Sequence, residues 1–416
     1  MYYRKQIILY ISEFLTSASF TILAAFYPGL AEEKGIPLWL IGFIFSLDPI
    51  LGLPTSYFAG KYMNRIGRKN LLTTGMAFGA CGIFLIGMIE YTHGYEAILM
   101  SFASRIFAGI GAGCSMVATS AILVIEYPDE VDKVIGYYEA ASGLGLLLGP
   151  IIGSVMSMIR ISISFSAAAL LWIIYLSLSH KLLGKLSTAV IISTPLPYKQ
   201  LLSRPKLLVD FCAQMWLLFT LGYMSTVIEL HLMTFGQRGI FIGIFYSLCT
   251  FTYFVTSLLE NKLLLIFNQK FLIVSGIFLT GVSFILMGPW EDILPRDFVI
   301  VAIGLGLTGF AGSIMYIPTT SHIIHTATTE YGIEYSDSLF DSVSACTNFF
   351  SNIGEIIGPI LAGFLSEYFG YSRGFLVVSG LSFLFCLIYL LLTRAPKRNK
   401  IQSEIDQEKQ STLIQE

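Results

Sequence analysis

Five acidic side chains lie within long apolar runs of this sequence, where an uncompensated charge is costly: Glu13, Asp48, Glu139, Glu229 and Glu355. A single arginine, Arg105, shares that environment. Ionisable groups in such runs usually face a protein interior or a water-filled path. Because burial favours the neutral form of a carboxyl group, each acid could hold a proton or an organic ammonium, but not both at once. The surplus of acids therefore predicts a site that exchanges protons for a cation.

The positions of these acids along their apolar runs place two of them near the middle of a membrane. With a helical rise of about 1.5 Å per residue, Asp48 lies about 16 Å from the start of its run and Glu355 about 21 Å into its own. Glu13 and Glu139 fall in the half expected to face the cytoplasm, and Glu229 in the opposite half. We expect the five acids to line one central chamber.

Each of these side chains also has a structural interpretation. Arg105 could pair with one acid or with backbone carbonyl groups. Asp48 precedes Pro49 and could cap a broken helix, and Glu139 could belong to a cytoplasmic gate. His231 stands near the end of its run and is expected at the membrane interface. Most tyrosines are expected to serve in packing, although some could stack on a cation in a cavity: Tyr57, Tyr223 and Tyr316.

The composition indicates which elements must position these residues. Hydrophobic residues make up 55% of the 416 residues and charged residues only 12%, about half the soluble average of roughly 25%. A membrane-spanning helix needs about 20 mostly apolar residues, and strands open to lipid would leave backbone groups unpaired. We therefore predict an all-α membrane protein with twelve spans, near 6–30, 37–60, 71–90, 97–125, 134–158, 161–183, 208–234, 239–260, 271–290, 298–325, 341–366 and 374–393.

The basic residues predict the orientation of these spans. An even number of spans places both termini on one side, and 19 of the 25 Lys and Arg residues flank the spans on that side. Because cytoplasmic loops carry the excess of positive charge, we expect both termini in the cytoplasm. The sequence leaves open whether the bilayer is a vesicle, an endomembrane or the plasma membrane.

A repeat predicts that the chain consists of two related halves. The fifth span contains Gly145-x-x-x-Gly149-Pro150, and the eleventh contains Gly354-x-x-x-Gly358-Pro359, 209 residues further on. Glycines four apart share one helix face and allow close helix approach. We expect six-helix bundles at 1–183 and 208–393, a cytoplasmic linker at 184–207 and a disordered cytoplasmic tail at 394–416. Such duplicated bundles place a binding site near the midplane between them.

A cationic loop after the second span carries a resemblance to a known family. The run Gly60-x-x-x-Asn64-Arg65-x-Gly67-Arg68-Lys resembles the loop signature G-x-x-x-D-R-x-G-R-K of the major facilitator superfamily. A tight glycine turn there would hold positive charge at a helix end, where the helix dipole is negative. The sequence departs from the signature at Asn64, where an aspartate is usual, which puts the charge relay of the cytoplasmic latch in doubt.

Two further motifs extend the resemblance. The fourth span reads Arg105-x-x-x-Gly109-x-Gly111-x-Gly113, which resembles R-x-x-x-G-x-G-x-G, and the glycine-proline motif of the fifth span resembles the antiporter signature. Three stretches are similar to the vesicular amine transporters, especially the polyamine branch, and to drug:proton antiporters: 26–35, 139–150 and 286–318. The resemblance implies proton-coupled antiport of an organic amine across a membrane, by a chain of two six-helix bundles that acts as a monomer.

Other functions remain open on the sequence. The second hypothesis is a facilitator for a neutral solute, and the third is a non-transporting membrane scaffold or receptor. We find no nucleotide-binding loop, metal-ligand cluster or nucleophile motif, so we expect no enzyme activity, cofactor or metal. The net charge of −2 gives no reason to expect nucleic-acid binding. The expected partners are a cationic small molecule, protons and the lipid bilayer.

Overall fold

The structure, a computed structural model, describes residues 2–158, 160–184, 198–289 and 295–394. Helices make up most of these residues, and no strand occurs among them. The helices are α1 (Tyr2–Glu33), α2 (Leu38–Ile66), α3 (Arg68–Met88), η1 (Ile89–Tyr91), α4 (Tyr95–Glu126), η2 (Pro128–Glu130), α5 (Val131–Ser157), α6 (Ile161–Leu182), α7 (Tyr198–Leu202), α8 (Pro205–Met233), α9 (Ile240–Ile266), α10 (Gln269–Met287), α11 (Phe298–Thr329), α12 (Asp337–Phe369) and α13 (Tyr371–Leu392).

Twelve of the described helices are long and apolar enough to cross a membrane, which confirms the predicted number of spans. They are α1 to α6 and α8 to α13. The narrow boundary between the fifth and sixth spans is also confirmed, since α5 ends at Ser157 and α6 begins at Ile161. The expected linker contains the short helix α7, while its residues 185–197 lie outside the described residues, as do residues 395–416 of the expected tail.

Prolines occur inside several spans without ending them. Helix α2 runs without a break through Pro49 and Pro54, so the interpretation of Asp48 as the cap of a broken helix is wrong. Proline removes one hydrogen bond of the helix ladder. Transmembrane helices tolerate this loss because neighbouring helices and small local adjustments satisfy the freed groups.

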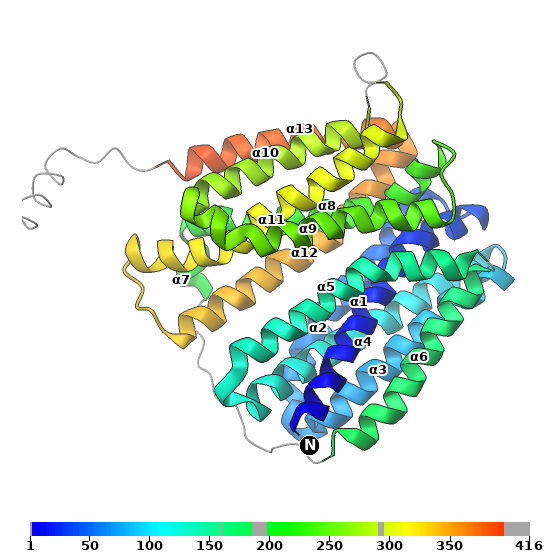
Figure 1. The fold of residues 1–416 in the computed structure, drawn as a ribbon, viewed down its shortest axis with the longest axis horizontal. Helices are drawn as coiled ribbons and strands as arrows, with labels where there is room; N and C mark the ends of the chain where they lie inside the picture. Colours follow the sequence, from blue (N-terminus) through cyan, green and yellow to red (C-terminus); the bar gives the residue numbers. More distant parts are fainter. Residues whose placement is uncertain (1, 159, 185–197, 290–294, 395–416) are drawn as a thin grey trace, which may run out of the picture.

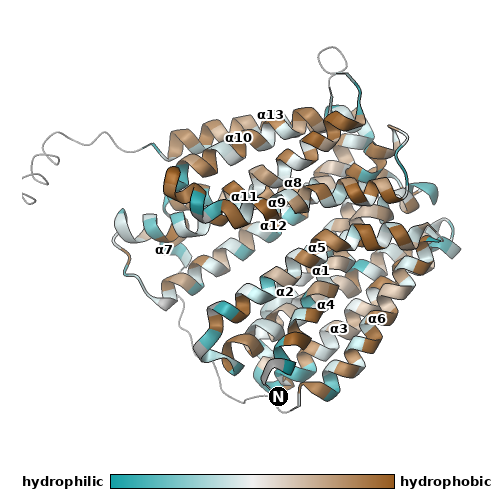
Figure 2. Ribbon diagram, in the orientation of Figure 1, coloured by the Kyte–Doolittle hydropathy of each residue, from teal (hydrophilic) through white to brown (hydrophobic). Residues whose placement is uncertain are grey.

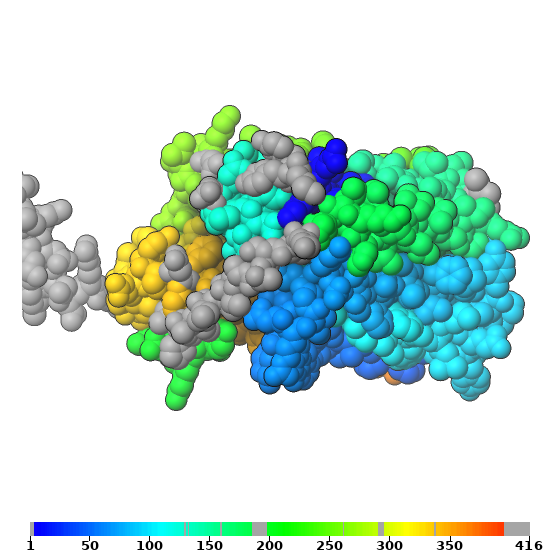
Figure 3. Space-filling model, turned by 90° about the horizontal axis from the view of Figure 1, so that it is seen from below, coloured from blue at the N-terminus to red at the C-terminus, as the bar shows by residue number. Residues whose placement is uncertain are grey.

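The spans form two six-helix bundles, α1 to α6 and α8 to α13, which lie side by side (Figure 1). One apolar core occupies the first bundle, and three smaller cores occupy the second. Figure 3 looks onto the first bundle: its blue to green helices cover most of that face, and the yellow segment around the α11–α12 connection projects beyond them. In Figure 2 apolar residues run along the helices, whereas hydrophilic colours gather at helix ends and in the connections.

Glycine contacts show the repeat between the bundles at atomic detail. In each bundle, two glycines of the fifth span face backbone carbonyl groups of the first span so closely that a Cβ atom would collide with them. A glycine of the fourth span faces a carbonyl group of the second span in the same way. The pairs are Gly145–Phe14, Gly149–Ala18 and Gly109–Asp48 in the first bundle, and Gly354–Met215, Gly358–Phe219 and Gly309–Cys249 in the second.

The terminal side is the face where α1 begins and α13 ends, and the distal side is the opposite face, where α1 ends and α13 begins. Ion pairs and hydrogen bonds tie the helix ends of each bundle together on the terminal side. Lys5 of α1 lies 2.5 Å from Glu126 of α4, and Lys206 of α8 pairs with Glu330 at the end of α11.

Candidate functional site

Contacts between the two bundles lie in the distal halves of the spans. Ser46 of α2 donates a hydrogen bond to the carbonyl oxygen of Ile356 in α12, at 2.7 Å. The hydroxyl of Ser247 in α9 donates in the same way to Leu147 of α5, at 2.9 Å. The stacked rings of Trp39 in α2 and Phe364 in α12 lie closer still to the distal face. Two further hydrogen bonds join the bundles in these halves, from the backbone N–H of Gly29 to Glu229 and from that of Leu38 to Glu367.

The two glycine-proline motifs meet the opposite bundle at this distal contact. The backbone carbonyl of Pro359 in α12 lies against Gly42 of α2, and that of Pro150 in α5 lies against Gly243 of α9. In each motif, the two glycines thus contact a helix of the same bundle, and the carbonyl group of the proline contacts a helix of the other bundle. Toward the terminal side the helices of the two bundles diverge (Figure 1).

Asp48 and Arg105 form an ion pair between α2 and α4, immediately beyond the distal contact. Nη1 of Arg105 lies 3.3 Å from Oδ2 of Asp48, and the guanidinium also donates to the Ser104 hydroxyl at 3.3 Å. The Arg105 side chain is buried, whereas the Asp48 side chain is 24% exposed. The structure thus favours the pairing interpretation of Arg105, with Asp48 as its partner.

Glu355 faces this pair from the second bundle. It lies on α12, within range of an electrostatic interaction with Asp48 across the interface. It also interacts electrostatically with Tyr316 of α11. The two acids expected at mid-membrane are therefore neighbours, although they come from different bundles.

Glu13 and Glu139 form a second acidic group, closer to the terminal side. The hydroxyl of Tyr138 in α5 donates a short hydrogen bond to Glu13 of α1. Ser17 also donates to Glu13, at 3.3 Å. Glu139 is the next residue along α5, is exposed, and interacts electrostatically with Glu13. The pair thus places negative charge where α5 borders the space between the diverging bundles.

Two tyrosines of the second bundle lie opposite this acidic group. Glu139 acts electrostatically on Tyr253 of α9 and on Tyr316 of α11. Tyr316 was among the residues expected to line a cavity. Tyr253 was not predicted, because its apolar run contains several aromatic residues and nothing in the sequence distinguishes one of them from the others. The interface therefore combines carboxylates with phenol rings, a combination that suits an organic cation.

Glu229 lies apart from the other four acids. Its carboxylate accepts a hydrogen bond from the backbone N–H of Gly29, at 2.8 Å, and joins α8 to α1 at the distal contact. Only 4% of the residue is exposed. This position makes Glu229 part of the contact that closes the distal side.

The signature loop forms the predicted tight turn between α2 and α3. Gly67 has a φ angle of +86°, which lies in the left-handed region that favours glycine. Arg68 is buried at the start of α3, whereas Gly60, Asn64 and Arg65 are exposed on the terminal side. These exposed positions border the region where the bundles diverge.

A polar cluster on the terminal side of the second bundle was missed by the sequence analysis. Asp210 of α8 is fully buried and accepts hydrogen bonds from Tyr389 of α13, at 2.6 Å, and from Nδ1 of His322 in α11, at 2.9 Å. All three lie within a few residues of a span's end, where polar side chains are common, so no local signal distinguished them. His231, expected at the membrane interface, is instead buried, and its Nε2 lies 2.7 Å from the Met287 carbonyl oxygen.

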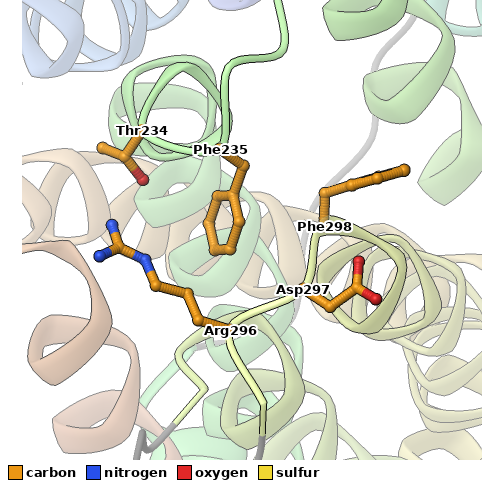
Figure 4. A pocket seen from close by; sticks show the side chains of 5 residues that line it. All are labelled: Thr234, Phe235, Arg296, Asp297 and Phe298. Atoms are coloured by element: carbon orange, nitrogen blue, oxygen red, sulfur yellow. The ribbon is translucent and has the colours of Figure 1, made fainter.

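A surface pocket of about 370 Å³ opens at the distal end of the second bundle (Figure 4). Its lining residues come from the end of α8 and the start of α11: Thr234, Phe235, Arg296, Asp297 and Phe298. The Arg296 guanidinium lies 5.4 Å from the centre of the Phe235 ring. Within the described part of the chain, no group of three or more His, Cys, Asp or Glu side chains could hold a metal ion.

The fold and the acidic interface define a polytopic membrane transporter built from two repeated six-helix bundles. The sequence model of the Major Facilitator Superfamily matches residues 9–333 and 242–415. The chain belongs to this superfamily, whose members are transporters and not enzymes.

Known relatives agree with this assignment. The MFS-type transporter SLC18B1 of Mus musculus is 27% identical, over 95% of this chain and 88% of its own. Multidrug resistance protein 2 of Bacillus subtilis (strain 168) is 24% identical, over 82% of this chain and 84% of its own. The crystal structure of the nucleoside transporter NupG superposes with a TM-score of 0.76 at 13% identity, covering 94% of this chain and 100% of NupG. That last likeness concerns the fold alone.

Proposed function

We propose that this protein is a proton-coupled antiporter of an organic cation, such as a polyamine, a monoamine or a cationic drug. The observation that carries the proposal is the acidic interface between the bundles. Asp48, Glu139 and Glu355 lie at this interface, with Glu13 beside Glu139, and Arg105 neutralises only Asp48. A cation entering this space meets net negative charge and the rings of the two facing tyrosines.

The exchange follows from competition for the same carboxylates. An amine and a proton exclude one another at the same carboxylate, so binding of one releases the other. When the bundles rock about the site, each ligand is carried to the opposite face. Glu229, at the distal contact, holds the distal side closed while the terminal side is open.

The orientation and domain boundaries are part of the proposal. The excess of Lys and Arg at the terminal ends supports a cytoplasmic terminal side, so that the described conformation is open to the cytoplasm. We further propose domains 1–183 and 208–393, a linker at 184–207, a tail at 394–416 and a monomeric state. The signature residues Gly60, Asn64, Arg65, Gly67 and Arg68 would then form the cytoplasmic gate when the bundles close there.

The relatives support the same class of substrate. The Bacillus relative is a multidrug resistance protein, and cationic drugs are among the proposed substrates. A facilitator of a neutral solute is the second candidate. If the acids at the interface only stabilise the fold, the flux of solute would not depend on a proton gradient. A scaffold without transport activity is the third candidate.

Uptake into proteoliposomes tests the proposal. The purified protein is reconstituted, and uptake of labelled spermidine and of a labelled monoamine is measured with and without an inside-acid pH gradient. Gradient-driven accumulation that a protonophore abolishes is the expected result. Flux that ignores the gradient would favour the facilitator, and the absence of flux for a panel of amines and neutral solutes would favour the scaffold.

A further inference from the structure

Glu260 is a buried acid of α9 that the proposed exchange does not use. It lies six residues before the end of the helix, and only 4% of the residue is exposed. Neither oxygen of its carboxyl group has a hydrogen-bond partner. Buried polar groups in folded proteins are nearly always paired, so an acid with two orphaned oxygens requires an explanation.

The helix face that carries Glu260 turns into its own bundle. Thr252 of the same helix donates a hydrogen bond to the carbonyl oxygen of Gly306 in α11, at 2.8 Å. Thr256 and Glu260 follow at intervals of four residues, and side chains at that spacing share one face of a helix. Both are buried. Glu260 therefore continues the stripe of α9 that packs against α11.

No positively charged side chain on the described parts of the surrounding helices pairs with Glu260. The described acidic and basic side chains in the terminal halves of the helices packed on α9 are Arg4, Lys5 and Glu13 on α1, Lys133 and Glu139 on α5, Lys206 and Asp210 on α8, and His322 and His325 on α11, while α9 itself carries Lys262. Lys5, Lys133, Lys206, Asp210 and His322 have partners elsewhere, in the pairs Lys5–Glu126, Lys133–Glu130, Lys206–Glu330 and Asp210–His322. No charged side chain of the described residues acts on Glu260.

An ionised carboxylate at this position would be unfavourable. Removing an unpaired charge from water costs several kcal/mol even after the protein relaxes, and unpaired buried acids become neutral instead. The carboxyl group must therefore carry a proton in this conformation or bind a cation. Among the described residues, Glu260 belongs to no group of three or more His, Cys, Asp or Glu side chains that could hold a metal ion.

Tyr253 connects Glu260 to the acidic interface. It lies seven residues before Glu260, which is two helical turns on the same face. Glu260 acts electrostatically on Tyr253, as do Glu139 and Tyr316 at the interface. Tyr316 in turn interacts with Glu355. Tyr253 is thus within electrostatic range of both the buried acid and Glu139 of the proposed exchange site.

We propose that Glu260 is a second proton-binding site, separate from the acids that bind the organic cation. It holds one proton while the terminal side is open, and it releases that proton to water when the bundles rearrange and its surroundings change. This inference rests on the proposed antiport. It adds one proton to each transport cycle, beyond those displaced directly by the substrate.

The test compares E260Q with the wild type and with E334Q, a matched change at an exposed acid. Proteoliposomes carry an inside-acid gradient of one pH unit, and labelled spermidine and a labelled monoamine are the probes. Each proton coupled to uptake raises the ratio of internal to external amine about tenfold per unit of pH gradient. Because E260Q lacks one coupled proton, it should accumulate about tenfold less amine. Exchange of internal for external amine without a gradient should persist in all three proteins.

The outcomes separate this inference from the proposed function. If the wild type shows no gradient-driven uptake, the antiport proposal fails first. If the wild type accumulates amine and E260Q does so equally well, the second proton site is wrong while antiport stands. If a sodium gradient drives uptake in place of the pH gradient and E260Q loses that response, Glu260 binds a metal cation and the proton site is also wrong.

Infrared difference spectroscopy gives an independent readout that does not depend on transport. The wild type at neutral pH should show the carbonyl stretching band of a protonated carboxyl group, and E260Q should lack it. E260D, which retains a carboxyl group, should show a shifted band and retain coupling, and it serves if E260Q fails to fold. The assignment would be overturned if the band were unchanged in E260Q. It would also be overturned if E260D showed no shifted band.

Discussion

The backbone N–H of Gly29 donates a hydrogen bond to the carboxylate of Glu229, 2.8 Å away, and this bond joins the first helix of one bundle to the first helix of the other. The two residues lie at the distal ends of α1 and α8. A Cβ atom on Gly29 would lie 2.6 Å from Oε1 of Glu229, so a larger residue there would force the carboxylate to shift. The bond therefore belongs to the contact that closes the distal side.

Removing the carboxylate of this bond should open the distal side. Glu229→Ala leaves the Gly29 N–H without an acceptor, which we expect to weaken the closed contact by about 1–3 kcal/mol. Spin labels at Tyr95 and Phe241, exposed positions near the distal ends of α4 and α9, report the separation by electron double resonance. The distance distribution should shift to longer values, whereas Glu334→Gln at an exposed acid of the terminal side should leave it unchanged.

The proline contacts give a matched pair of predictions across the repeat. A Cβ atom at Gly42 or at Gly243 would collide with the carbonyl group of the facing proline. We expect Gly42→Ala and Gly243→Ala each to cost about 1–3 kcal/mol in the closed distal contact, since overpacking forces the backbone to move. Amine uptake should fall in both variants. Gly380→Ala is the control, because nothing lies within 4 Å of its added atom, and an equal loss in this control would contradict the reason given.

The ion pair of α2 and α4 should be sensitive to the loss of one partner. Arg105→Leu leaves Asp48 without its cation, and breaking a buried pair costs about 3–5 kcal/mol. We expect the lower end of that range or less, because Asp48 is partly exposed. The melting temperature in detergent, followed by fluorescence-detected size exclusion, should fall.

A double variant of the same pair separates stability from transport. Asp48→Asn combined with Arg105→Gln removes both charges and should recover most of the lost stability, since no unpaired charge remains. Gradient-driven amine uptake should stay low, because the interface has lost an acid next to Glu355. Recovery of full uptake in the double variant would show that Asp48 has a structural role alone.

The buried cluster on the terminal side predicts a stability effect away from the exchange site. Tyr389→Phe removes the donor of a 2.6 Å hydrogen bond to Asp210. Hydrogen bonds to charged groups contribute about 1.5–3 kcal/mol, so the melting temperature should fall while the affinity for amine, measured by equilibrium binding, stays unchanged. Tyr95→Phe, at a highly exposed tyrosine, is the control. A large change in amine affinity would instead connect the cluster to substrate binding.

The sequence by itself determined the number of spans, the boundary at Arg160 and the repeat of the glycine-proline motif. These features depend on local properties: a run of about 20 apolar residues forms a spanning helix wherever it occurs, and glycines four apart share a face in any helix. The tight turn at Gly67 was predictable for the same reason. The acids could be recognised as unusual because of the apolar residues around them.

Only the tertiary structure decided which of these acids meet. Asp48 pairs with Arg105, Glu229 binds Gly29 at the distal contact, and Glu260 is buried without a partner. Each outcome depends on the rotation of a helix about its axis, and with 3.6 residues per turn an error of one residue turns a side chain by about 100°. Long-range packing of glycines, prolines and bundle cores fixes that rotation, and no local pattern in the sequence records it.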